Sequence, residues 1–287
     1  MYLTLKEILK DTRKNKFAVG AFNIHCLEMI PSMIKAAKVK NSPIILQISP
    51  TTCKYIGAQL LSSVVKELAE ETGVDVALHL DHTKDFATIK DAIDNGFSSV
   101  MIDASSLSLE ENIEKTKEVV KYAAKYGVSV EAELGTIGGT EEGVAMNDGK
   151  IIYTSPEDAV KFVEETGIDA LAIGFGTSHG QYKSKAKLSF NVLKEIYDVI
   201  KIPLVLHGGT GVSVEDLKKC ILGGISKVNV GTEQNVAWVI AAKENFGKAG
   251  VADSCRDLLI PSNDAIQKVI ENKIDILGSS NKNLILL

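Results

Sequence analysis

The stretch VDVALHLDH, residues 74–82, is an apolar run that ends in three polar side chains, His79, Asp81 and His82. Such a short apolar run is typical of a buried strand, which we expect over 74–80. Because side chains alternate along a strand, His79 and Asp81 share one face. His82 lies at the turn out of the strand, where it can bend toward the strand end. The stretch therefore predicts a strand whose carboxyl end carries chemistry.

Similar apolar runs recur along the chain, at 17–22, 43–48, 98–102, 127–133, 169–173, 202–206 and 226–230. Stretches of helical period separate them, such as 110–126, with Gly127 as the stop signal, and a helix opened by Ser155 and Pro156. Eight strands alternating with helices predict an α/β fold, a TIM (β/α)8 barrel with a C-terminal helical extension, as one domain over residues 1–287. A doubly wound open sheet is the alternative, but no GxGxxG follows the first strand.

The composition excludes several classes of protein. The net charge is −5 with no dense basic stripe, which argues against nucleic acid as a partner. No run of 18 apolar residues appears, and the first 15 residues lack the apolar segment of a signal peptide, so we expect no membrane association. The cysteines lie far apart and form no CxxC pair, which argues against disulfides and favours a reducing cytoplasm: Cys26, Cys53, Cys220 and Cys255.

Histidines gather at the predicted strand ends. Four of the five histidines, His79, His82, His179 and His207, lie at or just past a strand end. In a barrel these points converge on one mouth, where such enzymes do their chemistry. His82, His179 and His207 could form a three-histidine site for a borderline metal such as zinc. Asp81 would then be an acid/base group, and His79 would either support a ligand or form a hydrogen bond inside the barrel.

Two carboxylates follow neighbouring strands, Asp103 after the fourth and Glu133 in the fifth. They could hold a second or displaced metal position, or orient the histidine ligands. The alternative is a barrel carboxylate paired with a lysine such as Lys227.

Two glycine-rich segments follow the last two strands, at 208–211 and 229–232. This is the usual phosphate position of the fold, and glycines allow backbone N–H groups to approach an anion. Two long connections, 134–154 and 174–188, also follow strands, and we expect them to act as lids or binding segments.

Six motifs, in order along nearly the whole chain, carry a family resemblance. They are HLDH at 79–82, MIDAS at 101–105, SVEAELG at 129–135, GGTE at 138–141, GTSHG at 176–180 and LHGGTG at 206–211. The chain resembles the class II, metal-dependent ketose-bisphosphate aldolases. The resemblance implies a TIM barrel that is a homodimer or homotetramer. It also implies reversible cleavage of fructose 1,6-bisphosphate into dihydroxyacetone phosphate and glyceraldehyde 3-phosphate.

The resemblance also implies roles for individual residues. His82, His179 and His207 would bind catalytic Zn²⁺, and Asp81 would take the proton of the C4 hydroxyl. Glu141 would move the proton on the dihydroxyacetone phosphate carbon, with its neighbour Glu142 as the alternative. Asp103 and Glu133 match a second metal position.

The substrate and phosphate residues follow from the same motifs. A monovalent cation, Na⁺ or K⁺, often assists there. Arg256 matches an arginine that reaches the distal phosphate, often across the subunit boundary. The remaining matches are Asn23, Ser49, Gly180, Lys183, Gly208, Gly209, Thr210, Asn229, Val230, Gly231 and Thr232.

Other activities stay open at this point. At the position of Gly231, fructose-bisphosphate members of the family usually carry Asn or Asp, and tagatose-bisphosphate members usually carry a small residue. The stretch AFNIHCLE at 21–28 also resembles the tagatose type. The stretch GSSNK at 278–282 instead resembles the fructose type. A metal-dependent hydrolase fits the same ligands, although the phosphate loops argue against it. A catalytically silent relative that only binds sugar phosphates is a further alternative. Every catalytic position of the family is filled in this chain, which argues against it. A Schiff-base aldolase using Lys227 would give the three histidines no role.

Overall fold

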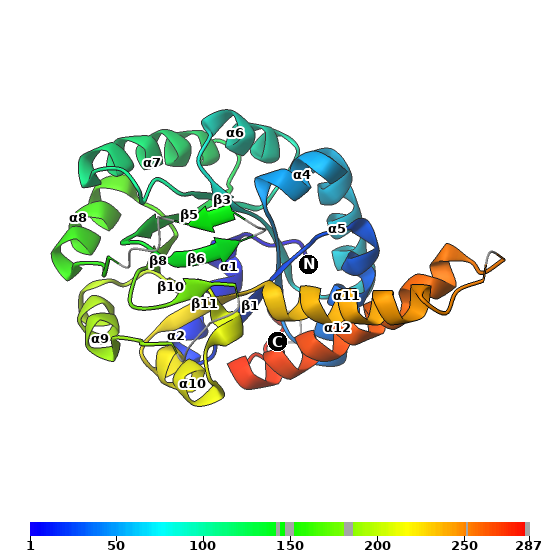
Figure 1. The fold of residues 1–287 in the computed structure, drawn as a ribbon. Helices are drawn as coiled ribbons and strands as arrows, with labels where there is room; N and C mark the ends of the chain where they lie inside the picture. The colour runs from blue at the N-terminus through cyan, green and yellow to red at the C-terminus, as the bar shows by residue number, and fades with distance from the viewer. Residues whose placement is uncertain (142–143, 147–151, 181–185, 251, 285–287) are drawn as a thin grey trace.

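Eight parallel strands form a closed barrel at the centre of the molecule (Figure 1). The computed structural model describes residues 1–141, 144–146, 152–180, 186–250 and 252–284, with the side chains of 139–141 and 144–146 left aside. Around the barrel the order is β1-β11-β10-β8-β5-β4-β3-β2. The predicted barrel is confirmed, and the open sheet is wrong. The strands are β1 (Val19–Asn23), β2 (Ile44–Ile48), β3 (Val76–Thr83), β4 (Ser99–Ile102), β5 (Ser129–Leu134), β8 (Ala170–Ile173), β10 (Leu204–Leu206) and β11 (Ile225–Val230).

Helices follow the strands and surround the barrel. Ser155 caps α8, and Pro156 is its first residue, as the sequence predicts. Helix α7 ends at Ala123 rather than at 126, because Lys125 and Tyr126 bond three residues back in a tighter turn. The helices are α3 (Ile30–Val39), α4 (Pro50–Ile56), α5 (Ala58–Thr72), α6 (Phe86–Asp94), α7 (Leu109–Ala123), α8 (Pro156–Thr166), α9 (Phe190–Val199) and α10 (Val214–Leu222).

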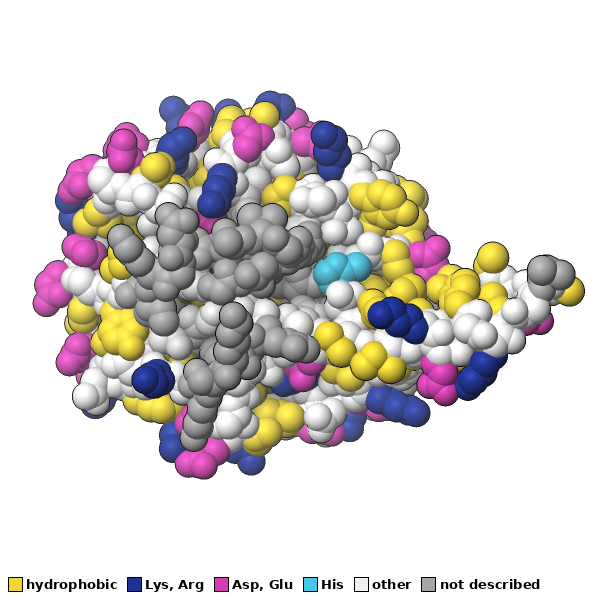
Figure 2. Space-filling model, viewed as in Figure 1, with side chains coloured by type: hydrophobic (Ala, Val, Ile, Leu, Met, Phe, Trp, Pro, Cys, Tyr) yellow, Lys and Arg dark blue, Asp and Glu magenta, His cyan; other side chains and the backbone are white. Residues whose placement is uncertain are grey.

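The predicted C-terminal helical extension is present. Helix α11 (Thr232–Phe246) leaves the barrel, and α12 (Cys255–Leu277) returns beside it and packs on α3. We call these two helices the arm; its tip projects away from the barrel (Figure 1). Hydrophobic side chains gather over the arm in the space-filling view (Figure 2). Within the described residues, no helix is both long and apolar enough to span a membrane.

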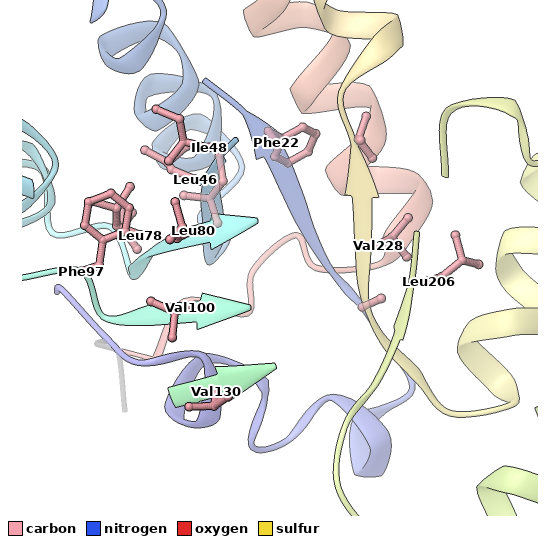
Figure 3. Packing of buried hydrophobic residues seen from close by; sticks show 14 of the residues in the cluster. Phe22, Leu46, Ile48, Leu78, Leu80, Phe97, Val100, Val130, Leu206 and Val228 are labelled. Carbon is pink, nitrogen blue, oxygen red and sulfur yellow. The ribbon is translucent and has the colours of Figure 1, made fainter. Parts of the chain in front are cut away.

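The two faces of the barrel strands carry different side chains. Large residues face outward and pack under the helices, as Phe22, Leu46, Leu78, Val130 and Val228 do (Figure 3). Apolar residues, most of them small, occupy the first inward positions of the strands, where a second cluster contains Ala21, Ile45, Ala77, Ala170, Ala172 and Val205. The same alternation brings later inward positions to the mouth as polar residues, namely His79, Asp81, Glu131, Glu133, His207, Lys227 and Asn229.

Two short helices, α1 (Leu5–Leu9) and α2 (Thr12–Asn15), lie at the amino-terminal end of the barrel. Leu5, Ile8 and Leu9 are buried in the cluster of small inward residues. Arg13 of α2 donates hydrogen bonds to the carbonyl oxygens of Tyr197, Ile200 and Ile202, at 3.0, 2.6 and 2.9 Å. This end is closed by packing, which leaves the carboxyl end for a site.

The two long connections meet in a small second sheet of order β7-β6-β9. Its strands are β6 (Gly138–Glu141), β7 (Val144–Met146) and β9 (Ser178–His179). Gly139 of β6 is paired in register with His179 of β9. The sheet therefore ties the segment that contains Glu141 to the backbone of one predicted metal ligand.

Candidate active site

A bulge in β3 places Asp81 and His82 side by side at the mouth of the barrel. The pairing of β3 with β4 shifts between Leu80 and Thr83, and His82 has a φ of 42°. Strand alternation would send these neighbours to opposite faces, and a bulge changes that direction locally. The expected turn at His82 is therefore a bulge inside a strand that continues to Thr83.

The three predicted histidine ligands come together there. Nε2 of His82 lies 2.8 Å from Nδ1 of His207. The ring of His179, from β9, has its centre 4.8 Å from that of His82 and 5.7 Å from that of His207. One nitrogen from each ring lies within 4.8 Å of the others, so one ion could contact all three.

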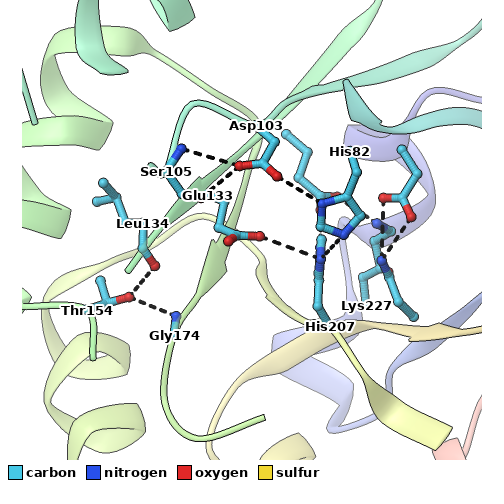
Figure 4. A network of polar contacts seen from close by, with 12 residues as sticks. His82, Asp103, Ser105, Glu133, Leu134, Thr154, Gly174, His207 and Lys227 are labelled. Carbon is cyan, nitrogen blue, oxygen red and sulfur yellow. Dashed lines mark hydrogen bonds and ion pairs between the residues drawn. The ribbon is translucent and has the colours of Figure 1, made fainter. Parts of the chain in front are cut away.

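The groups behind His82 and His207 determine which nitrogen each ring offers. Nδ1 of His82 lies 3.1 Å from Oδ2 of Asp103 (Figure 4). Nε2 of His207 lies 2.9 Å from Oε1 of Glu131. A carboxylate accepts a proton donor, so each ring carries its hydrogen on that nitrogen. The remaining nitrogens, 2.8 Å apart, then face each other with lone pairs. A cation between them relieves that repulsion, so the donor set fits a divalent metal.

Burial favours the neutral form of three of these histidines. It lowers the pKa of His179 and of His207 well below the usual 6.5, and proximity to His82 lowers both further, because two protonated imidazoles would repel each other. Burial, followed by the charge of Lys227, does the same for His79. Neutral imidazole is the form that binds metals.

The two predicted carboxylates, Asp103 and Glu133, form a second possible metal group with His82. Burial alone would raise the pKa of Asp103, but hydrogen bonds from His82 and Ser105 bring it well below its usual range. Burial and then the charge of Asp103 raise the pKa of Glu133 well above its usual value. Lys227, the alternative partner for these carboxylates, instead lies 2.8 Å from Oε2 of Glu131. Sequence reasoning did not assign a role to Glu131.

Asp81 lies beside the histidine cluster and is almost fully buried. Nδ2 of Asn229 approaches its two carboxyl oxygens at 3.5 and 3.4 Å. Nε2 of His79 lies 3.8 Å from Oδ1 of Asp81, and Nδ1 of His79 lies 2.8 Å from Oγ of Ser99. Burial raises the pKa of Asp81, which suits a group that must gain and lose a proton.

A cavity of about 200 Å³ opens next to His179. Gly208 on its wall has a φ of 70°, and a Cβ there would lie 2.1 Å from the carbonyl oxygen of Ser178, so only glycine fits. Sequence reasoning assigned no role to two further lining residues, His25 just after β1 and Asn235 in α11. His25 lies within the AFNIHCLE stretch at 21–28, whereas Asn235 belongs to none of the quoted motifs. The predicted residues in the lining are Asn23, His179, Gly180, Gly208, Thr210, Asn229, Gly231 and Thr232.

Other predicted residues do not line this cavity. Ser49 caps α4, where its Oγ accepts a hydrogen bond from the Thr52 amide at 3.2 Å. Val230 faces the helices, and Gly209 packs against Val228. Arg256 lies exposed on the arm, where its Nε is 3.0 Å from Oδ1 of Asp257. Lys183 and Glu142 lie outside the described residues, as does the side chain of Glu141, whose backbone belongs to β6.

Comparison with known proteins places this geometry in context. The family model "Fructose-bisphosphate aldolase class-II" matches residues 3–282. A fructose-bisphosphate aldolase of Staphylococcus aureus (strain Mu50 / ATCC 700699) is 42% identical over 283 residues, 98% of each chain. A fructose-bisphosphate aldolase of Geobacillus stearothermophilus is 43% identical, again over 98% of both.

Solved structures share the fold over nearly the whole length. The YdjI aldolase from Escherichia coli K12 superimposes with a TM-score of 0.87 at 33% identity, covering 99% of this chain and 100% of its own. A fructose-bisphosphate aldolase from Campylobacter jejuni gives a TM-score of 0.85 at 27% identity, with coverage of 98% and 97%.

Proposed function

Because the chain belongs to the class II fructose-bisphosphate aldolase family, we propose that it reversibly cleaves fructose 1,6-bisphosphate into dihydroxyacetone phosphate and glyceraldehyde 3-phosphate. The family makes the protein an aldolase, a carbon–carbon lyase, and sets the hydrolase and the Schiff-base aldolase aside. The names of the relatives support the substrate. The observation that carries the proposal is the pair of ligand nitrogens on His82 and His207, which face each other beside the cavity.

The proposal assigns the metal to His82, His179 and His207, and it names zinc because neutral imidazoles suit that ion. When bound, zinc supplies Lewis-acid polarisation of the substrate carbonyl. Asp103 holds His82 in position from behind, and with Glu133 offers a second metal position.

Asp81 is the base of the cleavage direction. It takes the proton of the C4 hydroxyl while the C3–C4 bond breaks, and C4 becomes the carbonyl carbon of the aldehyde product. The electron pair stays on the three-carbon fragment. Burial raises the pKa of Asp81, which makes it a stronger base than a solvated aspartate, and Asn229 keeps both carboxyl oxygens aligned. In the condensation direction the same proton returns to the aldehyde oxygen.

Glu141 completes the reaction by delivering a proton to C3 of the three-carbon fragment. Its support is the backbone position, since β6 is paired with β9, the strand of His179. Glu142, its neighbour, is the alternative. A variant of each, Glu141→Gln and Glu142→Gln, separates them through exchange of a proton on the hydroxymethyl carbon of dihydroxyacetone phosphate, the former C3 of the sugar, with deuterated water.

One phosphate would lie in the cavity against Gly208, Thr210 and Thr232. Backbone N–H groups of the short 3-10 helix Gly209–Gly211 and of the first turn of α11 suit an anion. Gly180, Lys183 and Asn229 to Thr232 are proposed to contribute, together with a Na⁺ or K⁺ ion. Ser49 and Asn23 are proposed substrate contacts, for which only the position of Asn23 in the cavity wall offers support.

The second phosphate would meet Arg256, supplied by a neighbouring subunit. Support comes from the arm, which carries Arg256 away from its own cavity and exposes Ile240, Phe246 and Ile260 at 61, 47 and 48%. We propose a homodimer or homotetramer of single-domain chains formed through this surface. A reducing compartment, the cytoplasm, suits the four free cysteines.

Tagatose 1,6-bisphosphate is the second candidate substrate, and one contact favours it. A Cβ at position 231 would lie 2.8 Å from Oδ1 of Asn23, so the glycine leaves Asn23 where a larger residue would displace it. The test is a cleavage assay coupled to detection of dihydroxyacetone phosphate, with both sugars run side by side. The larger kcat/KM names the substrate, and no cleavage of either sugar by the zinc-loaded protein contradicts the proposal.

A further inference from the structure

A buried ion pair lies beneath the candidate metal site and has no part in the mechanism above. Nζ of Lys227, on β11, is 2.8 Å from Oε2 of Glu131, on β5, and both side chains are 0% exposed. Desolvating two charges costs free energy that apolar residues of similar volume would not, so a buried ion pair is weak evidence for a role in stability. The pair therefore calls for another explanation.

The other oxygen of Glu131 contacts a metal ligand. Oε1 accepts a hydrogen bond from Nε2 of His207 at 2.9 Å, which leaves Nδ1 of His207 facing Nε2 of His82 (Figure 4). A continuous chain of contacts runs from Lys227 through Glu131 to His207. The corresponding support at His82 comes from Asp103, which Ser105 holds by a hydrogen bond of 2.7 Å.

A competing partner explains why Glu131 would need to be held. Nε2 of His79 lies 3.6 Å from Oε2 of Glu131, and within the described residues it has no hydrogen-bond partner. If Lys227 were absent, the carboxylate could rotate toward His79 and release His207. The ammonium group therefore fixes the direction of the carboxylate.

We propose that Lys227 and Glu131 are positioning residues that make His207 bind metal through Nδ1. This inference rests on the proposed function, because it concerns the zinc that His82, His179 and His207 are proposed to hold. Outer partners of metal ligands typically contribute about 10- to 100-fold in metal affinity.

The test measures zinc affinity rather than turnover. Metal-free wild type, Lys227→Met and Glu131→Gln are titrated with zinc in competition with a chromophoric chelator. Lys273→Met is the matched control, because Lys273 is a buried lysine whose Nζ lies 2.7 Å from Glu233 on the arm. We expect Kd for zinc to rise about tenfold or more in the first two variants and less than twofold in the control.

A double variant and a spectrum distinguish positioning from general damage. The double variant Glu131→Gln, Lys227→Met should have a Kd for zinc no larger than that of the single variant that binds zinc less tightly. The reason is that the two residues act as one unit. Cobalt-substituted Lys227→Met should show an altered visible absorption band. A Kd within twofold of wild type in Lys227→Met, additive losses, or an equal loss in Lys273→Met would each overturn the inference.

Two further outcomes keep the tests separate. If Lys227→Met does not fold, Glu131→Gln against the control decides alone. A wild-type protein that binds one zinc but cleaves no sugar bisphosphate removes the proposed function and leaves the positioning role standing. A wild-type protein that binds no zinc overturns both.

Discussion

Nε2 of His82 and Nδ1 of His207 lie 2.8 Å apart, and each ring is fixed from its far side by a carboxylate. The two rings thus offer different nitrogens to one point. His82 stands on the bulge of β3, and His207 directly follows β10. Two separate strand ends are needed to create this point, which makes it a property of the closed barrel.

The first prediction removes one of these nitrogens. His207→Ala should lose bound zinc and reduce kcat by on the order of 10³, because Lewis-acid polarisation is worth several kcal/mol. Zinc content by atomic absorption and the cleavage rate are the measurements. The circular dichroism spectrum should be unchanged, and full activity in a zinc-free variant would refute the assignment.

The second prediction concerns Asp81. Asp81→Asn keeps the shape and the contact with Asn229 but cannot take a proton. We expect kcat to fall by about 10²- to 10⁴-fold, the usual range for a general base, with zinc content unchanged. A variant with wild-type kcat would move the base elsewhere.

The third prediction follows from the lowered pKa of His179 and His207. A proton displaces a metal only when the pH falls through the pKa of the ligand, so a ligand pKa below 6.5 moves zinc release below pH 6.5. Equilibrium dialysis over a pH series should therefore give a release midpoint below 6.5. A midpoint at or above 6.5 would contradict the prediction, because burial of His179 and His207 would then not set the pH of release.

Much of this site was predictable from sequence, and the limits have physical causes. Strand ends converge in any barrel, so the proximity of the three histidines could be predicted from the sequence. The bulge at His82 could not, because a shift in strand pairing leaves no mark in hydrophobic alternation. Glu131 and Glu133 share a face, and only the position of Lys227 across the barrel separates their roles.

The fold, like the site, was predictable only in part. Apolar runs predicted all eight strands, whereas the pairing of β6 with β9 joins two loops of mixed polarity that carry no strand signal. His25 was missed in the cavity because the AFNIHCLE stretch was used only to compare substrates, and Asn235 was missed because it belongs to none of the quoted motifs. Ser49 caps α4, and its contact with substrate stays a prediction.

The fourth prediction tests the contact between Gly231 and Asn23. In Gly231→Ala the new Cβ would lie 2.8 Å from Oδ1 of Asn23, whose hydrogen bond from Gln47 is also 2.8 Å. A displaced Asn23 would also lose its proposed hydrogen bond to substrate, worth about 1 kcal/mol, so KM should rise by roughly three- to tenfold with zinc affinity unchanged. Steady-state kinetics on both sugars measure this, and an unaltered KM would show that Asn23 does not contact substrate.

The fifth prediction concerns stability at the closed end of the barrel. Arg13→Met leaves three carbonyl oxygens without their donor and should lower the free energy of unfolding by about 2–3 kcal/mol. Urea unfolding followed by circular dichroism measures it. Lys14→Met, an exposed neighbour on α2, should change stability by no more than about 0.5 kcal/mol.

The central claim is that cleavage requires a metal held by His82, His179 and His207. It is tested by the cleavage rate of fructose 1,6-bisphosphate before chelation, after removal of metal with EDTA and after addition of zinc, with metal content measured at each stage. The account predicts that activity disappears with the metal and returns at one zinc per chain. Full activity in protein shown to be free of metal would contradict it.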